Sequence, residues 1–395
     1  MTKRTLLPAL GAATLLVSAL AAVSPAADAA PTMHGKRVCS VSRAATSASC
    51  SAKVLVDAAG AVPHSTSPAA SARTPTELRS AYSLTGTSSG GRTVAIVDAY
   101  GYPNLARDLA TYRSQFKLST CTTSSGCLKI LDQNGGTSLP RFNAGWAGEQ
   151  ALDVDAVSAI CPDCKILVVQ ARSSSITDLG TAVRTAANQA GVVAISNSYG
   201  GGDLSDSTYG SYYNHPGIAV TASTGDDGYQ GGSFPASSSY VTAVGGTTLT
   251  AASNTRGWTE SAWSGAGSGC SAVNTALAAA ANSRTGCSKR AIADVAAAAD
   301  PSNGGMAVFY PTSQTASTWA QVGGTSEASP IIASVYALSG NTSGYANAIP
   351  YSHTASLNDV TGGSNGTCPT TQWCNARTGW DGPTGLGTPK GTGGF

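Results

Sequence analysis

Thr93-Val94-Ala95-Ile96-Val97 is a short, continuous apolar run, and a helical pattern follows it over residues 104–116. The same alternation returns further along the chain, with apolar runs at 165–169, 192–196 and 218–222 and helical patterns at 145–160 and 176–190. Short apolar strands that alternate with helices are typical of a mostly parallel sheet with helices on both faces. We therefore predict a single α/β domain in which ligands bind at the carboxyl ends of the strands.

The beginning of the chain has the features of an export signal. Met1-Thr2-Lys3-Arg4 is basic, residues 6–23 are apolar and rich in alanine, and Ala27-Asp28-Ala29 offers small residues for cleavage. This order is that of a secretory signal peptide, which we place at 1–29. No later apolar run approaches the length that spans a membrane. We expect a secreted, extracellular protein that acts as a monomer and has no membrane association once the signal peptide is removed.

Residues 30–73 are polar and rich in Ala, Ser, Thr and Pro, and they show no sustained period. Such a composition is typical of a short pro-segment or linker. A helix start follows it, since Thr74 is placed to cap a helix whose first residue is Pro75. The predicted domain therefore spans residues 74–395, and neither an internal repeat nor a long linker interrupts it.

The ten cysteines fit an oxidising compartment, where disulfides persist. Each cysteine has one near neighbour and none is left over, so the spacing suggests five local pairs, although sequence alone does not prove the connectivity. A lone CxxC, here Cys161-Pro162-Asp163-Cys164, is also the spacing of a redox or zinc site, but without a second ligand pair it favours a structural disulfide. The suggested pairs are Cys39–Cys50, Cys121–Cys127, Cys161–Cys164, Cys270–Cys287 and Cys368–Cys374.

Charge is sparse in this chain. Charged residues make up 11% of it, and the formal net charge is +2. No basic patch with interleaved aromatic residues is present, which argues against nucleic acid as a partner. Few carboxylates are available to change charge on acidification, so the composition permits a fold that tolerates low pH.

Gly323-Gly324-Thr325-Ser326-Glu327-Ala328-Ser329-Pro330 brings small residues to a corner in front of the apolar run 331–338. We interpret the stretch as a loop that enters a helix, with Ser326 near the first turn. Unpaired N–H groups and the positive end of the helix dipole stabilise an anion at such a place. Ser326 is therefore a candidate nucleophile. The alternative is that Ser326 caps the helix, which is the commoner use of serine at a helix start.

Glu149 and Asp153 are four residues apart in a helical pattern, which puts both carboxylates on one face. A solvated acidic face is the usual explanation of such a pair. The flanking residues are apolar, however, and two buried carboxylates share a proton instead of both ionising. That arrangement supplies a general base together with a second group that orients and tunes it.

A second acidic spot, Asp226-Asp227, follows the run 218–222 in a glycine-rich turn. Aspartate in such a turn is ordinarily a turn former. Here the turn comes at the carboxyl end of a predicted central strand, where catalytic groups of open sheets gather. The polar run 196–201 also follows a strand, and we expect it to line a substrate pocket.

Histidine is absent from all of these stretches. His64 lies in the predicted linker, and His215 and His353 lie in polar loops. A serine hydrolase built from these motifs must therefore use carboxylates in place of histidine.

Together these stretches resemble the sedolisin family, the serine-carboxyl peptidases, which share the subtilisin-like fold and replace the catalytic histidine by glutamate. The resemblance covers roughly residues 74–395 and rests on Gly324-Thr325-Ser326 with Pro330, on Glu149-x-x-x-Asp153, and on Thr224-Gly225-Asp226-Asp227-Gly228. It implies that Ser326 is the nucleophile, Glu149 the general base and Asp153 the partner of that base. It gives Asp226, where subtilisins carry asparagine, the role of stabilising the oxyanion.

Two stretches near the C-terminus, Asp359-Val360 and residues 379–387, are similar to the calcium site of that family. The resemblance implies one structural Ca²⁺, held by the carboxylates of Asp359 and Asp381 and by backbone carbonyls. Oxygen-only ligation suits a hard cation. The family usually has glycine at the position of Arg377. Arginine can replace it only if the backbone there does not adopt a positive φ. The implied carbonyl ligands are Val360, Arg377 and Gly379.

The resemblance implies a secreted endopeptidase that hydrolyses peptide bonds in protein or peptide substrates through an acyl-enzyme. It also implies a preference for acidic pH, because Asp226 has to be neutral to donate a hydrogen bond to the oxyanion. Family members commonly carry a long folded pro-domain that blocks the active site, and residues 30–73 are too few for one. Two alternatives stay open: a catalytically inactive secreted binding protein on the same fold, and a Ser-His-Asp peptidase that uses His215.

Overall fold

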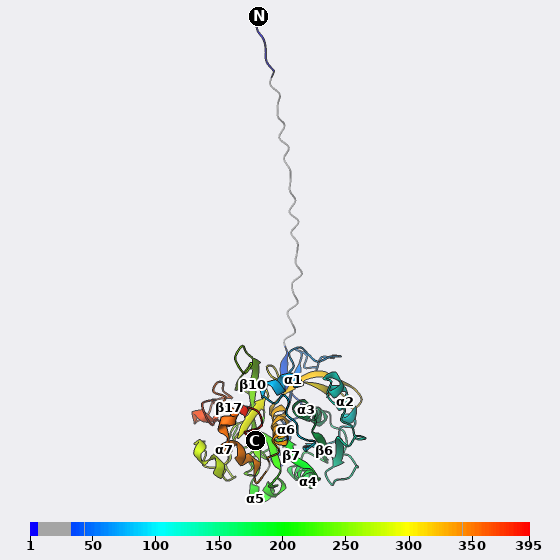
Figure 1. Ribbon diagram of the computed structural model, residues 1–395, viewed down its shortest axis with the longest axis vertical. Coiled ribbons are helices and arrows are strands. Elements are labelled where there is room, and N and C mark those ends of the chain that lie inside the picture. Colours follow the sequence, from blue (N-terminus) through cyan, green and yellow to red (C-terminus); the bar gives the residue numbers. More distant parts are fainter. Residues whose placement is uncertain (7–32, 43, 342) are drawn as a thin grey trace. The chain divides into compact units, whose positions relative to one another are not determined.

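Eight strands form the central sheet, and every pair except one is parallel (Figure 1). The strand order is β11-β10-β9-β7-β4-β6-β5, and β14 also pairs with β10. The antiparallel pair, β10 with β11, lies at one edge of the sheet. This architecture confirms the predicted mostly parallel sheet. The strands are β4 (Thr93–Ala99), β5 (Leu128–Asp132), β6 (Lys165–Ala171), β7 (Val192–Asn197), β9 (Ala219–Ser223), β10 (Thr242–Ala251), β11 (Trp258–Ala262) and β14 (Val295–Ala298).

The computed structural model describes residues 1–6, 33–42, 44–341 and 343–395. Residues Met33–Phe395 form one compact unit. Most of the signal peptide predicted at 1–29 therefore lies outside the described residues. Across the described part of the chain, no helix combines the length and the apolar character that crossing a membrane requires.

Side chains that alternate along β4 show how the sheet is covered. Val94 and Ile96 belong to the core on one face, whereas Ala95 and Val97 belong to the core on the other. The first core also contains residues of α1 (Pro75–Ala81), α2 (Leu105–Gln115), α3 (Ala144–Ile160) and α6 (Thr325–Ser339), and the second contains residues of α4 (Ile176–Ala187). Helices therefore cover both faces, as predicted.

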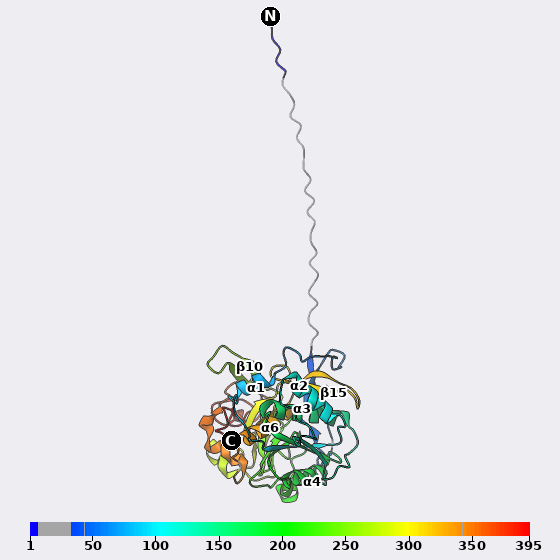
Figure 2. The same ribbon diagram turned by 45° about the vertical axis from the view of Figure 1, so that its right-hand side comes forward.

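α3 and α6 are neighbours on the first face, and Figures 1 and 2 show them next to each other. Almost every residue of both helices is buried. A helix that is enclosed on all sides carries apolar and small residues around its whole circumference, and any polar side chain on it is removed from water. Glu149, Asp153 and Ser326 are such side chains.

Local sequence explains where several helices begin. The Thr74 hydroxyl accepts a hydrogen bond from the Glu77 amide, and the Glu77 carboxylate accepts one from the Thr74 amide at 2.9 Å. This reciprocal cap, with Pro75 as the first helical residue, confirms the predicted helix start. Asn143 caps α3 and Ser175 caps α4 through their side-chain oxygens, which accept from the Trp146 and Asp178 amides.

The segment predicted as a linker is instead built into the fold. A four-stranded sheet has the order β1 (His34–Arg37), β3 (Lys53–Val56), β16 (Ser317–Gly323) and β15 (Met306–Pro311), and β2 (Ser49–Cys50) pairs with β8 (Tyr199–Gly200). The compact unit therefore begins at Met33, and the prediction that order starts at Thr74 is wrong. Strands of two to four residues are too short to show a period, and these pair with distant parts of the chain.

The remaining elements are short and lie mainly in the C-terminal half. They include two antiparallel two-stranded sheets, β12 with β13 and β17 with β18. Their bounds are α5 (Asp206–Tyr209), η1 (Gly210–Tyr212), β12 (Gly269–Cys270), η2 (Ala278–Ser283), β13 (Ala291–Ile292), η3 (Ala346–Ala348), α7 (Ile349–Ser352), η4 (Thr354–Ser356), β17 (Leu357–Asn358), η5 (Thr371–Trp373) and β18 (Thr388–Pro389).

All five suggested cysteine pairs are disulfides in the structure. No cysteine of the described residues is free. The bridges join positions 3 to 17 residues apart, so each closes a short local loop. Cys161-Pro162-Asp163-Cys164 is thus a disulfide that follows the end of α3, as the absence of a second ligand pair predicts.

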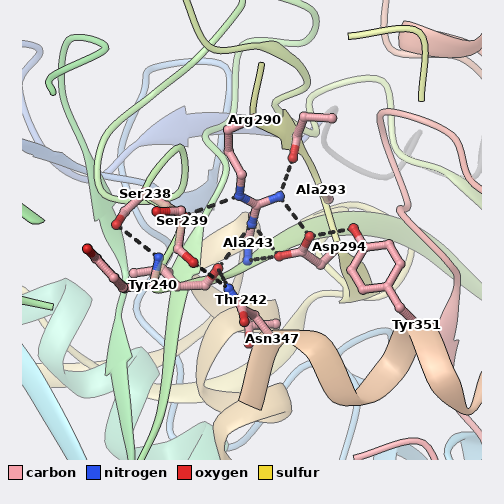
Figure 3. A network of polar contacts seen from close by, with 12 residues as sticks. Ser238, Ser239, Tyr240, Thr242, Ala243, Arg290, Ala293, Asp294, Asn347 and Tyr351 are labelled. Atoms are coloured by element: carbon pink, nitrogen blue, oxygen red, sulfur yellow. Dashed lines mark hydrogen bonds and ion pairs between the residues drawn. The ribbon is translucent and has the colours of Figure 1, made fainter. Parts of the chain in front are cut away.

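A buried ion pair fixes the junction between β13, β14 and β10 (Figure 3). Arg290 and Asp294 are both almost fully buried, and Arg290 Nη1 lies 2.8 Å from Asp294 Oδ1. Asp294 Oδ2 also accepts a hydrogen bond from the Ala243 amide of β10 at 2.8 Å. The Tyr351 hydroxyl donates to Asp294 Oδ1 at 2.7 Å, and the guanidinium donates to the carbonyls of Ser238 and Val241. Each charge is therefore paired and hydrogen-bonded, which offsets the cost of desolvation.

Removing one partner of this pair leaves the other charge buried without compensation. We expect Asp294→Ala to lower the free energy of unfolding by about 3–5 kcal/mol, as breaking buried ion pairs does. Chemical denaturation measures the change. The matched control is Arg172→Ala, which removes an ion pair with Asp178 in which Arg172 is 78% exposed, and which should cost about 0–1 kcal/mol. Equal losses in the two variants would contradict this account.

Candidate active site

Ser326 is the second residue of α6, at the point where β16 turns into that helix. Gly324 occupies the capping position with φ = 108°, a conformation that strongly favours glycine. The Ser326 hydroxyl does not cap the helix, because it donates to the carbonyl oxygen of Ser198 at 3.1 Å. The alternative interpretation of Ser326 as the helix cap is therefore wrong. Its side chain is fully buried in this structure.

Ser198, directly after β7, links Ser326 to α3. Its hydroxyl lies 2.8 Å from Asp153 Oδ1 and 3.3 Å from the carbonyl oxygen of Ser326. That carbonyl is available because Pro330, four residues on, has no N–H to bond with it. The run 196–201 thus contributes a residue that orients both the serine and the carboxylate pair.

Glu149 and Asp153 lie on the same side of α3, and both are fully buried. The alternative of a solvated acidic face is therefore wrong. Burial raises the pKa of Glu149 well above its ordinary value, the nearby Asp98 raises it further, and the Ser326 hydroxyl acts in the opposite direction. Burial likewise raises the pKa of Asp153, with Asp98 and Glu149 adding to the effect and the Ser198 hydroxyl opposing it.

Asp98 is a third carboxyl of this cluster, and the sequence analysis missed it. It lies near the end of β4 and is fully buried. Burial raises its pKa to about 8, while a hydrogen bond with Asp153 lowers it in part. Among the described residues, no lysine or arginine forms an ion pair with Asp98, Glu149 or Asp153. The signal that could have identified Asp98 is its place as the charged residue that ends an apolar central strand.

Asp226 approaches the same helix start from the turn after β9. Its Oδ1 accepts hydrogen bonds from the Thr325 amide at 2.8 Å and from the Thr325 hydroxyl at 3.0 Å. Its Oδ2 is buried and has no hydrogen-bond partner among the described residues. Burial raises the pKa of Asp226 to about 7, although the Thr325 amide and the Lys53 ammonium act to lower it. Among the described residues, Oδ1 of Asp226 is thus hydrogen-bonded to Thr325, whereas Oδ2 has no hydrogen-bond partner.

These residues come together because of the strand order. β4, β7 and β9 are adjacent parallel strands, so their carboxyl ends meet at one edge of the sheet. Asp98 is near the end of β4, Ser198 follows β7, and Asp226 follows β9. α3 and α6 pack on this sheet and bring Glu149, Asp153 and Ser326 to the same edge.

His215, the residue of the Ser-His-Asp alternative, has a different environment. Its Nε2 pairs with the carbonyl oxygen of Tyr212 at 2.9 Å, in the loop before β9. Burial lowers its pKa. Within the described part of the chain, His215 forms neither an ion pair with a carboxylate nor a hydrogen bond with Ser326.

The residues of the predicted calcium site also converge. Asp381 is fully buried, and its Oδ2 accepts a hydrogen bond from the Arg377 amide at 3.1 Å. The Gly379 amide donates to Asp359 Oδ2 at 3.0 Å. Burial raises the pKa of Asp381 to about 7, and the charge of Asp359 adds to the rise. Two carboxyls therefore face one loop, and among the described residues no lysine or arginine side chain forms an ion pair with either of them.

The backbone of this loop fits a hard cation. The carbonyl oxygens of Val360, Arg377 and Gly379 accept no hydrogen bond from the described residues, and so have free lone pairs. Arg377 is not among the residues with positive φ, so its replacement of glycine causes no strain. No cluster of three or more His, Cys, Asp or Glu side chains suited to a metal occurs in the described residues. A cation here would therefore depend on the carbonyls.

Comparison with known proteins identifies the family of this chain. Residues 142–360 match the model of the subtilase family. The chain belongs to the subtilase family. This subtilase is 30% identical over 368 residues to kumamolisin of Bacillus sp. (strain MN-32), an alignment that covers 83% of this chain and 64% of kumamolisin. It is 38% identical over 109 residues to tripeptidyl-peptidase sed1 of Aspergillus fumigatus, which covers 26% of this chain and 15% of that protein.

A solved structure shares the fold of this subtilase. Pseudomonas sedolisin, a serine-carboxyl proteinase in complex with pseudo-iodotyrostatin, superposes with a TM-score of 0.67 at 24% sequence identity. The match covers 82% of this chain and 96% of sedolisin. The predicted subtilisin-like fold and the predicted resemblance to the sedolisin family are therefore confirmed. The chain spans about 64% of the length of kumamolisin, the first of the curated relatives it matches.

Buried neutral carboxyls make the stability of this subtilase depend on pH. Glu327 of α6 is a further case, because burial raises its pKa well above the ordinary value and neither of its carboxyl oxygens has a hydrogen-bond partner among the described side chains. The unfolded chain loses these protons near pH 4, whereas the folded chain keeps them to higher pH. The folded state then binds more protons, so its stability falls as pH rises above about 4.

We therefore expect the free energy of unfolding to decrease between about pH 4 and pH 7, by up to about 1.4 kcal/mol per pH unit for each such carboxyl. Glu327→Gln removes one of these protons and should make the decrease shallower. Urea denaturation at a series of pH values measures the slope. Asp227→Asn, at a carboxyl that is 47% exposed, is the control. A stability maximum above pH 7 would contradict the prediction.

Proposed function

We propose that this subtilase is a secreted serine-carboxyl endopeptidase that hydrolyses peptide bonds in proteins through an acyl-enzyme. The observation that carries the proposal is the convergence of a helix-start serine, Ser326, with buried carboxyls and no histidine. Glu149 and Asp153 lie on the neighbouring helix, and Asp226 faces the same helix start. Kumamolisin and sedolisin, to which the chain is similar, support the assignment.

Ser326 supplies the nucleophile in this proposal. Its Oγ attacks the carbonyl carbon of the substrate, and Glu149 accepts the proton and later gives it to the leaving amine. Asp153 positions Glu149, and its own position is fixed by the Ser198 hydroxyl at 2.8 Å. Burial raises the pKa of Asp98, Glu149 and Asp153, and Asp98 raises those of the other two further, so the trio resists holding more than one negative charge. In this proposal Glu149 carries that negative charge and acts as the base.

The oxyanion has two donors in this scheme. The Ser326 amide belongs to the first turn of α6, where N–H groups have no partner within the helix. Asp226 is the second donor, through Oδ2, while Oδ1 stays bonded to Thr325. Donation requires the protonated carboxyl, since an ionised Asp226 would repel the oxyanion. The raised pKa of about 7 keeps Asp226 neutral in acid and in mildly acidic solution.

Proteolysis itself is the test of the proposal. We expect the purified chain to cleave casein after incubation in acid. Ser326→Ala and Glu149→Gln should both lose activity. Loss of the base in Glu149→Gln should lower the rate by roughly 10²–10⁴-fold. His215→Ala should retain full activity, because within the described residues that ring is hydrogen-bonded to the Tyr212 carbonyl and not to Ser326. Failure to cleave casein at any pH from acid to neutral would favour the inactive binding protein. A strong loss in His215→Ala would favour the Ser-His-Asp alternative.

The pH profile tests the role of Asp226. Activity should be high in acid and fall as pH rises through about 7, the pKa of Asp226. Asp226→Ala should lower kcat by about 10²–10³, the usual cost of one oxyanion donor. Asp226→Asn replaces the acid by an amide that donates at every pH, so the fall near neutrality should disappear. The control Asp227→Asn, at the neighbouring exposed carboxyl, should keep the wild-type profile. An activity optimum above neutrality that Asp226→Asn leaves unchanged would refute the assignment.

Export and calcium belong to the same proposal. The signal-like residues 1–29 and the five disulfides support an extracellular location. One Ca²⁺ would be held by the carboxylates of Asp359 and Asp381 and by the carbonyls of Val360, Arg377 and Gly379. The ion would neutralise the two facing carboxylates and so stabilise the loop; it takes no part in the reaction.

Chelation tests the calcium proposal. We expect EGTA to lower the melting temperature of the protein and added Ca²⁺ to restore it, because an ion that binds the folded state alone stabilises it by RT ln(1 + [L]/Kd), about 2.7 kcal/mol at 100 times Kd. Asp381→Asn should abolish the response to Ca²⁺. The control Asp57→Asn changes a carboxyl in a distant loop and should respond as wild type does. A melting temperature that is insensitive to EGTA and Ca²⁺ would rule the site out.

A further inference from the structure

Tyr100 comes directly after β4 and has an unusual backbone conformation. Its φ of 61° lies in the left-handed region, where a bulky side chain is strained and glycine is not. The Tyr100 amide donates to the carbonyl oxygen of Ala171 at 2.7 Å, so the neighbouring strand β6 holds this conformation. Backbone strain of this kind is concentrated at functional sites. The fold thus keeps a strained aromatic residue at the carboxyl edge of the sheet.

The backbone of Tyr100 is tied to the groups of the candidate site. Asp98, a member of the buried carboxyl cluster, is two residues before it in the chain. The Gln150 side chain donates to the carbonyl oxygens of Ala99 at 3.3 Å and of Tyr100 at 3.2 Å. Gln150 directly follows Glu149 in α3. Tyr100 is therefore fixed to the helix that bears the proposed base.

A row of three aromatic rings connects Tyr100 with β8, the short strand that follows Ser198. The Tyr100 ring centroid lies 6.5 Å from that of Trp146, which is one helical turn before Glu149 in α3. The Trp146 ring in turn lies 6.2 Å from that of Tyr199 in β8. Trp146 and Tyr199 are buried, whereas Tyr100 is partly exposed. The row therefore reaches the surface at the ring of Tyr100.

The guanidinium of Arg141 lies over that ring. Arg141 Cζ is 5.7 Å from the Tyr100 ring centroid, which is within the range of a cation–π contact. The Gly101 amide donates to the Arg141 carbonyl oxygen at 2.8 Å, and Gly101 also forms a β-bridge with Phe142, so the backbone of this loop is fixed as well. Arg141 is exposed, and no carboxylate of the described residues forms an ion pair with it. Its positive charge is therefore available to a ligand.

From this arrangement we infer that Tyr100 and Arg141, here called the platform, bind an acidic side chain of the substrate close to the bond that is cut. The Arg141 guanidinium takes the carboxylate of a glutamate or aspartate, and the Tyr100 ring packs against the methylene groups of that side chain. The inference rests on the proposed peptidase function. It deepens that function because it names the class of substrate that the site prefers.

Arginine suits this role in an enzyme that works in acid. Its guanidinium stays protonated at every relevant pH, and its planar fork of N–H donors matches a carboxylate. A glutamate side chain of a substrate has an ordinary pKa of about 4.3, so it is charged at about pH 6 and neutral at about pH 3. Asp226, whose pKa is raised to about 7, is still largely neutral at about pH 6. The preference for acidic side chains should therefore be present at about pH 6 and fade in stronger acid.

The experiment compares peptides that differ by a single charge. Each pair carries glutamate or glutamine at one position, both ends are blocked by acetyl and amide groups, and the position is moved along the peptide on both sides of the cleaved bond. The purified wild-type chain, after incubation in acid, is assayed for kcat/KM at about pH 6 and about pH 3. We expect glutamate to be favoured about 5-fold at one position at about pH 6, the upper end for an exposed ion pair. At about pH 3 the two peptides should be cut at nearly equal rates.

Two arginine variants test which charge is responsible. Arg141→Gln removes the cation of the platform and should abolish the preference for glutamate at about pH 6. The matched control is Arg172→Gln, which removes an equal charge. Arg172 directly follows β6 at the same edge of the sheet and is 78% exposed, but it is already paired with Asp178. This control should keep the wild-type preference.

Variants of Tyr100 separate binding from packing. Tyr100→Gly places a residue without strain at the positive φ, so relief of the strain should offset much of the lost ring contact and the protein should lose little stability. The preference for glutamate should fall, because the ring that holds Arg141 is gone. Tyr100→Phe keeps the ring and should keep the preference. Urea denaturation measures the stability of both variants. A large loss of stability in Tyr100→Gly together with a retained preference would show that Tyr100 only packs, and would overturn its role.

A binding measurement separates the platform from the peptidase function. Blocked tripeptides with a central glutamate or glutamine are too short for an endopeptidase, and calorimetry at about pH 6 compares their affinities for wild type and for Arg141→Gln. Tighter binding of the glutamate peptide by wild type alone, without cleavage of casein or of any peptide, would refute the peptidase and leave the platform standing.

The other outcomes also decide between the two proposals. Cleavage of both members of every pair at equal rates at about pH 6 would overturn the platform and leave the peptidase function standing. A preference for glutamate that survives in Arg141→Gln, or that persists at about pH 3, would overturn the platform too, because the ion pair would not be its cause. Absence of both cleavage and any difference in binding would refute the two proposals together.

Discussion

Desolvation of carboxyl groups is the constraint on which the candidate site depends. Asp98, Glu149 and Asp153 are enclosed between α3 and the carboxyl edge of the sheet, and no basic residue among the described ones pairs with them. An isolated buried charge is so costly that such groups take up protons instead. The same physical effect raises the pKa of Asp226 to about 7, which is what the proposed role as a neutral donor requires. The expected stability in acid and the proposed acid-side chemistry thus have one cause.

The helix start at Ser326 joins this cluster to the backbone of the N-terminal segment. Gly324 turns the chain with a positive φ, Thr325 is held by Asp226, and the Ser326 amide points away from the helix. Because the amide cannot bond within the helix, it takes the carbonyl of Ser51 as its partner. The position that would stabilise an oxyanion is therefore filled by a peptide group of the chain itself.

The short N-terminal strands are ordered because their contacts are supplied by the rest of the fold. Isolated strands of two to four residues have no stability of their own. Here β2 is added to β8, and β3 is added to β16, on either side of the nucleophile. The disulfide Cys39–Cys50 closes the loop between the strands.

The sequence by itself determined the α/β fold, because strands such as β4 and helices such as α2 carry their period within ten or so residues. It also supplied Ser326, Glu149, Asp153 and Asp226, whose motifs are local. Only the tertiary structure decided that Asp98 joins them, that Glu149 is buried, and that the carbonyl of Ser51 accepts from the Ser326 amide. Burial and pairing between distant segments are set by the strand order and by packing across the whole domain, and neither leaves a periodic trace in the neighbouring sequence.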